Sequence, residues 1–148
     1  MFVRTLKLHD FTIFYFDGHG NYRDLLSAVN QYIDAGTTEK ELFYFDKDAQ
    51  IITPDQVRSI VSVASRAAKI RKPGGKTALL YGRMSLYGLG RIYKVAEGRI
   101  IEKNWDTEVF KTLAEAASWL QVPREVVEES IHKCNLTADQ KPFLYQVS

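Results

Sequence analysis

Short strand-like runs alternate with longer helix-like stretches along most of this chain, and this alternation limits the folds available to it. Expected strands span 2–8, 11–16, 41–46, 77–81 and 104–110, and expected helices span 22–33, 54–68, 85–97, 113–120 and 123–132. Strands joined by crossover helices lie parallel, so the pattern predicts an α/β fold. The first two strands are separated only by His9 and Asp10, which predicts an opening antiparallel hairpin. The sheet is therefore expected to be mixed and mainly parallel.

Local signals predict where three of these helices begin or end. Gly36 follows the first helix, where a left-handed C-terminal cap is expected. Thr53 is placed to cap the second helix, with Pro54 in its first turn and Gln56 at the capping-box position. Ser85 is placed to cap the third helix.

The chain is long enough for one domain, and 45% of its 148 residues are hydrophobic, which suffices for a single core. We expect an α/β domain over 1–122 and an appended helix and tail over 123–148 that is not an independent domain. The apolar residues of the tail are expected to pack on the body or on a second subunit.

Several features predict a cytoplasmic protein. No stretch approaches the 18 apolar residues of a membrane span, and the first residues lack the apolar core of a signal peptide. The single cysteine, Cys134, excludes an internal disulfide and suits a reducing compartment.

Positive charge is concentrated in one third of the chain. The net charge is only +2, yet residues 66–99 carry nine basic residues and one acid, Glu97, so this segment has +8 and the remainder −6. Such asymmetry creates a local field that attracts anions or an acidic partner. A run of solvated surface charges is the alternative interpretation.

The glycines in this basic segment do not form a phosphate-binding motif. The sequence GGKT at 74–77 follows an expected helix and precedes a strand, the reverse of a P-loop, and GLGR at 88–91 lies inside a helix. Glycine inside a helix is unfavourable relative to alanine, and close approach of another backbone or of a ligand would compensate for this cost.

Helical spacing divides the helix over 85–97 into two faces. The expected core side holds Leu86, Leu89, Ile92, Tyr93 and Ala96, and the expected outer side holds Tyr87, Gly90, Arg91 and Lys94. With Arg83 in the preceding turn, the candidate ligand-binding residues are Arg83, Tyr87, Arg91 and Lys94.

Three interpretations of this basic face stay open: unspecialised surface, contact with a protein or small anion, and contact with nucleic acid. Nucleic acid is the least favoured, because the patch is one helix long and no recognised nucleic-acid-binding motif accompanies it. The sequence contains no recognisable catalytic constellation or metal-ligand set, and no cofactor is predicted.

Two hypotheses of function follow. The first is a non-enzymatic interaction domain, with a protein partner and a homodimer as expected assemblies, whose basic face contacts an acidic partner or anion. The alternative is a small-molecule or lipid carrier with a pocket lined by aromatic residues such as Tyr15, Phe43 and Tyr93.

The order of elements, with the segments TPDQV, LYGLGRIYKVAE and TEVFKTLAEAASWL, resembles the STAS-like domains over about residues 2–122. This family shares the fold of the anti-sigma-factor antagonists and of sulfate-transporter cytoplasmic domains, and the similarity is to a stand-alone bacterial branch. The resemblance implies successive β–α units and a role in protein–protein contact. The antagonists carry a phosphorylated serine after the central strand, whereas the matching segment here, DKDAQIITPDQ, holds no serine and only Thr53 as a hydroxyl. The phosphorylation switch is therefore not transferred.

Overall fold

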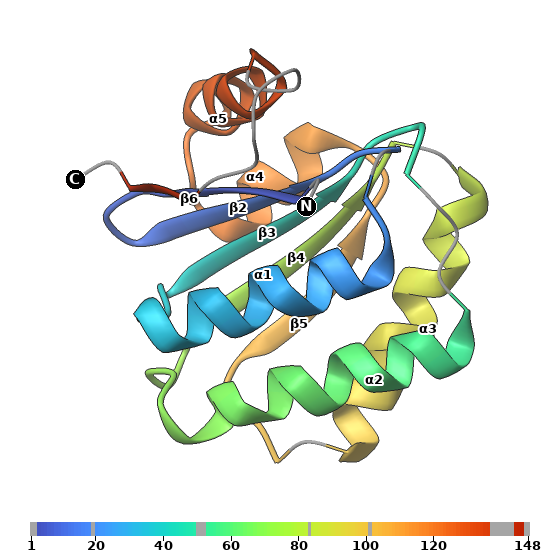
Figure 1. Ribbon diagram of the computed structural model, residues 1–148. Coiled ribbons are helices and arrows are strands. Elements are labelled where there is room, and N and C mark those ends of the chain that lie inside the picture. The colour runs from blue at the N-terminus through green and yellow to red at the C-terminus, as the bar shows by residue number, and fades with distance from the viewer. Residues whose placement is uncertain are drawn as a thin grey trace.

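A mixed β-sheet runs through the centre of the molecule, with helices on both faces (Figure 1). The computed structural model describes residues 3–18, 20–49, 53–82, 84–100, 102–136 and 144–146. Within these residues the strand order is β5-β4-β3-β2-β1-β6. The strands are β1 (Val3–Lys7), β2 (Phe11–Phe16), β3 (Lys40–Phe45), β4 (Lys76–Tyr81), β5 (Asp106–Phe110) and β6 (Leu144–Gln146). The fold is α/β, as the sequence predicted.

The opening hairpin and the parallel strands after it are both confirmed. Strand β1 pairs antiparallel with β2, so that Val3 lies opposite Phe16, and the turn is closed by the amide of Leu8, which donates to the carbonyl of Phe11 over 2.7 Å. Strands β2, β3, β4 and β5 are all parallel to their neighbours.

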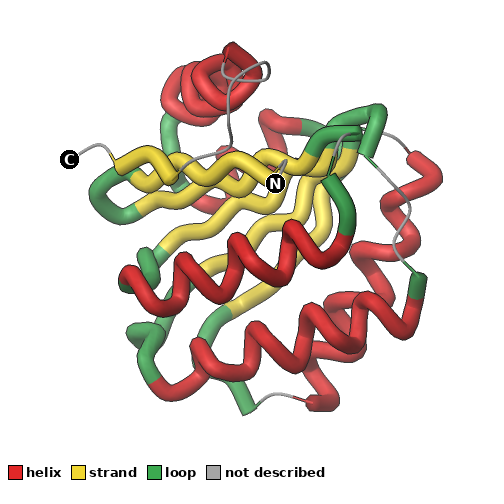
Figure 2. The backbone as a smooth tube through the Cα atoms, viewed as in Figure 1, coloured by secondary structure: helices red, strands yellow, loops and turns green. Residues whose placement is uncertain are grey.

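The helices form one layer on each face of the sheet. They are α1 (Tyr22–Ala35), α2 (Pro54–Ala64), the 3₁₀ helix η1 (Ser65–Lys69), α3 (Met84–Ile100), α4 (Leu113–Leu120) and α5 (Arg124–Leu136). Helices α1, α2 and α3 pack side by side on one face, and α4 and α5 lie on the other, as Figure 2 shows in the same view.

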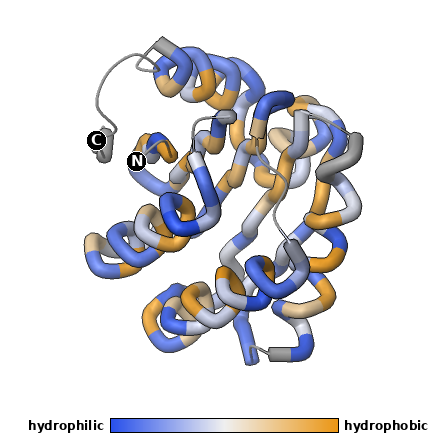
Figure 3. Tube along the Cα trace, turned by 45° about the vertical axis from the view of Figure 1, so that its right-hand side comes forward, coloured by the Kyte–Doolittle hydropathy of each residue, from blue (hydrophilic) through white to orange (hydrophobic). Residues whose placement is uncertain are grey.

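Each face of the sheet has its own hydrophobic core because side chains alternate along a strand. Phe14, Phe16 and Phe45 face α1 and α2, whereas Ile13 and Leu42 face α4 and α5. The helices alternate between hydrophobic and hydrophilic residues along their coils, as the hydropathy colouring in Figure 3 shows. Each helix therefore buries one stripe and exposes another.

Of the three predicted helix ends, one is confirmed in full, one is confirmed in position only, and one is wrong. The Thr53 side chain caps α2 in a complete capping box with Gln56. Gly36 is the C-terminal cap of α1, and its amide donates to the Tyr32 carbonyl over 3.0 Å. Its φ of 112° is positive, but its ψ of 127° lies outside the left-handed helical region, so the expected left-handed conformation is wrong. Helix α3 begins at Met84, which places Ser85 inside the helix rather than at its cap.

The last described elements lie against the opening hairpin. Helix α5 packs on β1 and β2, and the backbone of β6 pairs parallel with β1, with residues 5–7 opposite 144–146. Phe143, one of the apolar tail residues, lies outside the described residues, and the backbone of 144–146 packs on the body of the same chain.

Candidate functional site

Two regions of the structure gather polar or charged side chains, and the first is a polar row inside the molecule. Lys7, Thr12, Glu41, Thr77 and Thr107 lie in register on five adjacent strands, on the face that α1, α2 and α3 cover. Thr12, Glu41, Thr77 and Thr107 are buried. Buried polar groups require partners, so this row demands an internal hydrogen-bond network.

Glu41 is the centre of the first part of this network. Its Oε1 pairs with Arg71 Nη1 at 3.1 Å and accepts a hydrogen bond from Thr77 Oγ1 at 2.8 Å. Its Oε2 accepts from the Tyr32 hydroxyl at 2.6 Å. Burial raises the pKa of Glu41, although the charge of Arg71 opposes this shift. The guanidinium of Arg71 also lies 4.9 Å from the centre of the Trp105 ring. Arg71 is therefore a core residue, and its charge does not contribute to an exposed basic surface.

A second buried ion pair lies beside the first. Lys103 Nζ donates to Glu97 Oε1 at 2.5 Å and to Thr107 Oγ1 at 3.1 Å. The Thr107 hydroxyl also donates to Glu97, which is 1% exposed. Burial, followed by the charge of Glu97, raises the pKa of Tyr93 well above its ordinary value. The carboxylates of Glu41 and Glu97 are thus bound by cations and hydroxyls of the same chain. This arrangement is typical of residues that stabilise a fold.

The interior next to this network contains a small cavity of about 30 Å³, lined among others by Tyr32, Phe43, Tyr93 and Trp105. This volume is about one tenth of the smallest typical ligand pocket. Phe43 and Tyr93 both line the cavity, as the carrier hypothesis expected. Tyr15 does not, because it belongs to the core on the opposite face of the sheet. The carrier hypothesis stays a prediction, because this interior cavity is too small to hold a typical ligand.

The second region is the outer surface of α3, and its orientation differs from the sequence prediction. Gly90 is buried rather than exposed, because a Cβ there would lie 2.5 Å from Tyr81 Cε2 and 2.9 Å from Val109 Cγ1. Glu97 is buried on the same side of the helix. With these two residues facing the sheet, Ile92 turns outward and is 42% exposed, which corrects its assignment to the core.

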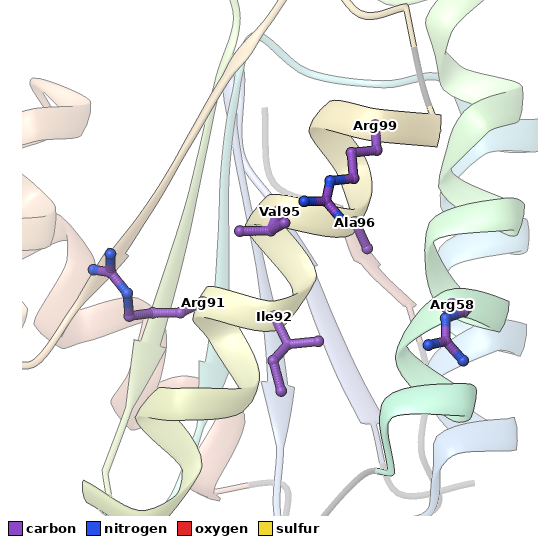
Figure 4. Close-up of a pocket in the computed structure, with 6 residues that line it drawn as sticks. All are labelled: Arg58, Arg91, Ile92, Val95, Ala96 and Arg99. Atoms are coloured by element: carbon purple, nitrogen blue, oxygen red, sulfur yellow. The ribbon is translucent and has the colours of Figure 1, made fainter.

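An open groove of about 410 Å³ runs between this face of α3 and α2. Its lining residues are Arg58 of α2 and Arg91, Ile92, Val95, Ala96 and Arg99 of α3. Ile92 and Ala96 point from α3 toward α2, and Arg58 extends from α2 toward α3 (Figure 4). Val95 is 53% exposed. The groove therefore combines exposed aliphatic side chains with arginines, a composition that sequence reasoning did not assign to one site.

The predicted site residues separate in the structure. Arg91 borders the groove, but its side chain points away from α2 (Figure 4), and its charge acts on Glu108 of β5. Lys94 donates to Glu108 Oε2 at 2.8 Å. The Tyr87 ring contacts the Lys111 ammonium, 4.8 Å from its centre. Arg83 lies outside the described residues.

Elsewhere in the basic run, intramolecular partners reduce the free positive charge. Arg66 Nη2 pairs with Asp34 at 2.6 Å. At the groove, Arg58 pairs with Asp55 of its own helix. Within the part of the chain that the structure describes, Arg91 and Arg99 form no ion pair. These two arginines lie on α3 at either end of the exposed pair Ile92 and Val95, so the groove keeps a net positive charge.

Comparisons with protein-family models, with curated proteins and with solved structures find no match to this chain. Among the described residues, none of the helices has both the length and the apolar character that crossing a bilayer requires.

Proposed function

We propose that this protein is a non-enzymatic interaction domain that binds an acidic protein partner at the α2–α3 groove. The observation that carries this proposal is the pair of exposed aliphatic side chains, Ile92 and Val95, between Arg91 and Arg99, two arginines with no ion pair to any residue that the structure describes. Apolar side chains supply the area that a partner buries, and the arginines select acidic partners and raise the association rate.

The distribution of charge in the folded chain supports an acidic partner. Arg71 and Lys103 are used in buried ion pairs, and Arg66 and Lys94 have acidic partners at the surface. Arginine is enriched at protein interfaces, because its planar guanidinium binds carboxylates in two-point contacts. At the groove, arginines of the basic segment therefore lie next to the exposed aliphatic side chains of Ile92 and Val95.

The resemblance to STAS-like domains also supports protein–protein contact as the role. The phosphorylation switch of the antagonists is not part of the proposal. In this chain the Thr53 hydroxyl accepts a hydrogen bond from the Gln56 amide and so serves as the α2 cap. A cytoplasmic location belongs to the proposal as well, and the single cysteine, buried in α5, is consistent with it.

Site-specific photo-crosslinking in cells tests this function. Val95 is replaced with p-benzoylphenylalanine, and Ser118, exposed on α4 across the sheet, is replaced in a matched control. We expect a discrete crosslinked product from position 95 that is absent from position 118. The product should disappear when Arg91 and Arg99 are both changed to Glu. Identical products from the two positions, or a product that survives the charge reversal, would contradict the proposal.

A further inference from the structure

Packing within the described chain does not explain why two positions on the exposed side of α3 are glycine. Gly88 and Gly98 are exposed, and a Cβ built on either would meet nothing within 4 Å. Gly90 differs, because its Cβ would collide with Tyr81 and Val109. Glycine weakens a helix relative to alanine, so its presence where alanine would fit calls for another cause. A second backbone that packs closely on this side of α3 supplies that cause.

The positions of these glycines match the exposed apolar residues. Gly88, Ile92, Val95 and Arg99 are separated by four, three and four residues, which places them along one face of the helix. This face is about 16 Å long at 1.5 Å per residue. Gly98 lies on the adjoining row, seven residues after Arg91. The face therefore offers a small residue at one end, two aliphatic side chains in the middle and positive charge along its length.

We propose that the occupant of the α2–α3 groove is an amphipathic α-helix with acidic flanks, a proposal that rests on the proposed function. An α-helix docks in a groove through apolar side chains spaced at i, i+3, i+4 and i+7. Ile92 and Val95 receive these side chains, and Gly88 allows the helix axis to approach. Glutamate or aspartate residues of the incoming helix pair with Arg91 and Arg99.

Two other occupants fit the observations less well. A second copy placed by two-fold symmetry would present the same patch, whose lining holds three arginines and no acidic residue, so it would offer no opposite charge to Arg91 and Arg99. An anionic membrane would also attract arginines. Membrane-binding helices, however, present an apolar face with residues such as Trp, Phe and Leu, whereas this groove is lined by three arginines and three smaller aliphatic residues, Ile92, Val95 and Ala96.

The test uses two helical peptides of about 18 residues, long enough to be helical in water when stapled. Both carry leucine at i, i+3, i+4 and i+7, and they differ only in flanking residues, glutamate in one and lysine in the other. Binding is followed by amide shifts in two-dimensional NMR of the full chain. We expect the glutamate peptide to shift residues 88–99 of α3 and residues near Arg58, with a Kd on the order of 100 μM at low salt. The lysine peptide should cause no saturable shift.

Variants of the protein test which residues of α3 bind the peptide. Changing Arg91 and Arg99 to Glu should weaken the glutamate peptide about tenfold or more, since two charge contacts become repulsive. Changing Arg23 and Arg124 to Glu makes the same change in net charge away from the groove and should leave the Kd within about twofold. Gly88→Ala should weaken binding several-fold while the protein stays folded.

Other outcomes would overturn the inference. They are equal shifts from both peptides, shifts centred away from α3, an unchanged Kd in Gly88→Ala, and no saturable shift up to about 1 mM peptide. Binding to vesicles with about 30% phosphatidylserine, without peptide binding, would show that the groove binds a membrane surface and not a helix. If the Arg-dependent crosslink at position 95 forms but neither peptide binds, the interaction function stands and the helical occupant is wrong. If both experiments fail, the groove is not a binding site.

Discussion

Replacing Gly88 with alanine is expected to stabilise the free protein. The new methyl group enters open space, since a Cβ at this position has no heavy atom within 4 Å, and the position lies inside α3. Alanine is favoured over glycine in helix interiors by about 0.5–1 kcal/mol. For a chain of this size 1 kcal/mol shifts Tm by about 2–4 °C. The expected rise in Tm is therefore about 1–4 °C.

The matched control is Gly90→Ala, which makes the same chemical change two residues away on the same helix. Here the Cβ would lie 2.5 Å from Tyr81 Cε2 and 2.9 Å from Val109 Cγ1. The Tyr81 ring cannot move away freely, because it stacks on Phe45 with ring centres 4.7 Å apart. Overpacking of this kind costs about 1–3 kcal/mol, which exceeds the gain in helix propensity. Gly90→Ala should therefore lower the stability.

Urea denaturation followed by circular dichroism measures both variants against the parent protein. The midpoint should rise for Gly88→Ala and fall for Gly90→Ala, with unchanged slope in both. A loss of stability in Gly88→Ala would show that the position is packed in the free protein, and the reasoning from open space would fail. A gain in Gly90→Ala would refute the orientation of α3 on which the exposed groove depends.

Three further predictions concern other parts of the chain. Lys103→Met should lower the free energy of unfolding by about 3 kcal/mol in urea denaturation, because it leaves the buried Glu97 carboxylate without its cation; a loss below about 0.5 kcal/mol would contradict a buried ion pair. Thr53→Ala should cost about 1 kcal/mol by removing the α2 cap, and Thr53→Asp should restore most of it; equal stability of all three proteins would exclude the cap. The hydrogen bond from Lys94 lowers the pKa of Glu108 below its ordinary value of 4.5, so the stability from this contact is present above pH 4.5 and is lost as the pH falls. Carboxyl NMR titration should show this pKa rising toward 4.5 in Lys94→Ala, and an unchanged pKa would contradict the contact.

Local patterns were sufficient to predict the fold class and most elements. The helix over 113–120 was predicted with the bounds it has, and the capping box at Thr53 was predicted residue by residue. Both depend on neighbours within four positions in the sequence, where spacing and side-chain chemistry act directly. The opening hairpin was predictable for the same reason.

The candidate site was predicted only in part, because it depends on contacts between distant segments. Arg91 was identified as exposed and basic, and it lines the groove. The rotation of α3 was missed, because glutamate is rarely buried without a partner and the partner of Glu97, Lys103, comes from the following loop. Once Glu97 faces the sheet, Ile92 must face outward. Val95, an apolar residue outside the predicted core stripe, is a signal in the sequence that points to this surface.

The strand order has a consequence for how this chain reaches its fold. From β1 to β5, every strand pairs with the strand that precedes or follows it in the sequence. Such neighbouring pairings keep loop-closure costs small and favour rapid folding. The sheet can therefore grow one strand at a time from the opening hairpin, in the order in which a ribosome delivers the segments. Strand β6 is the exception, since it must return to β1 across nearly the whole chain length. We expect its pairing to form last and to open first in hydrogen exchange.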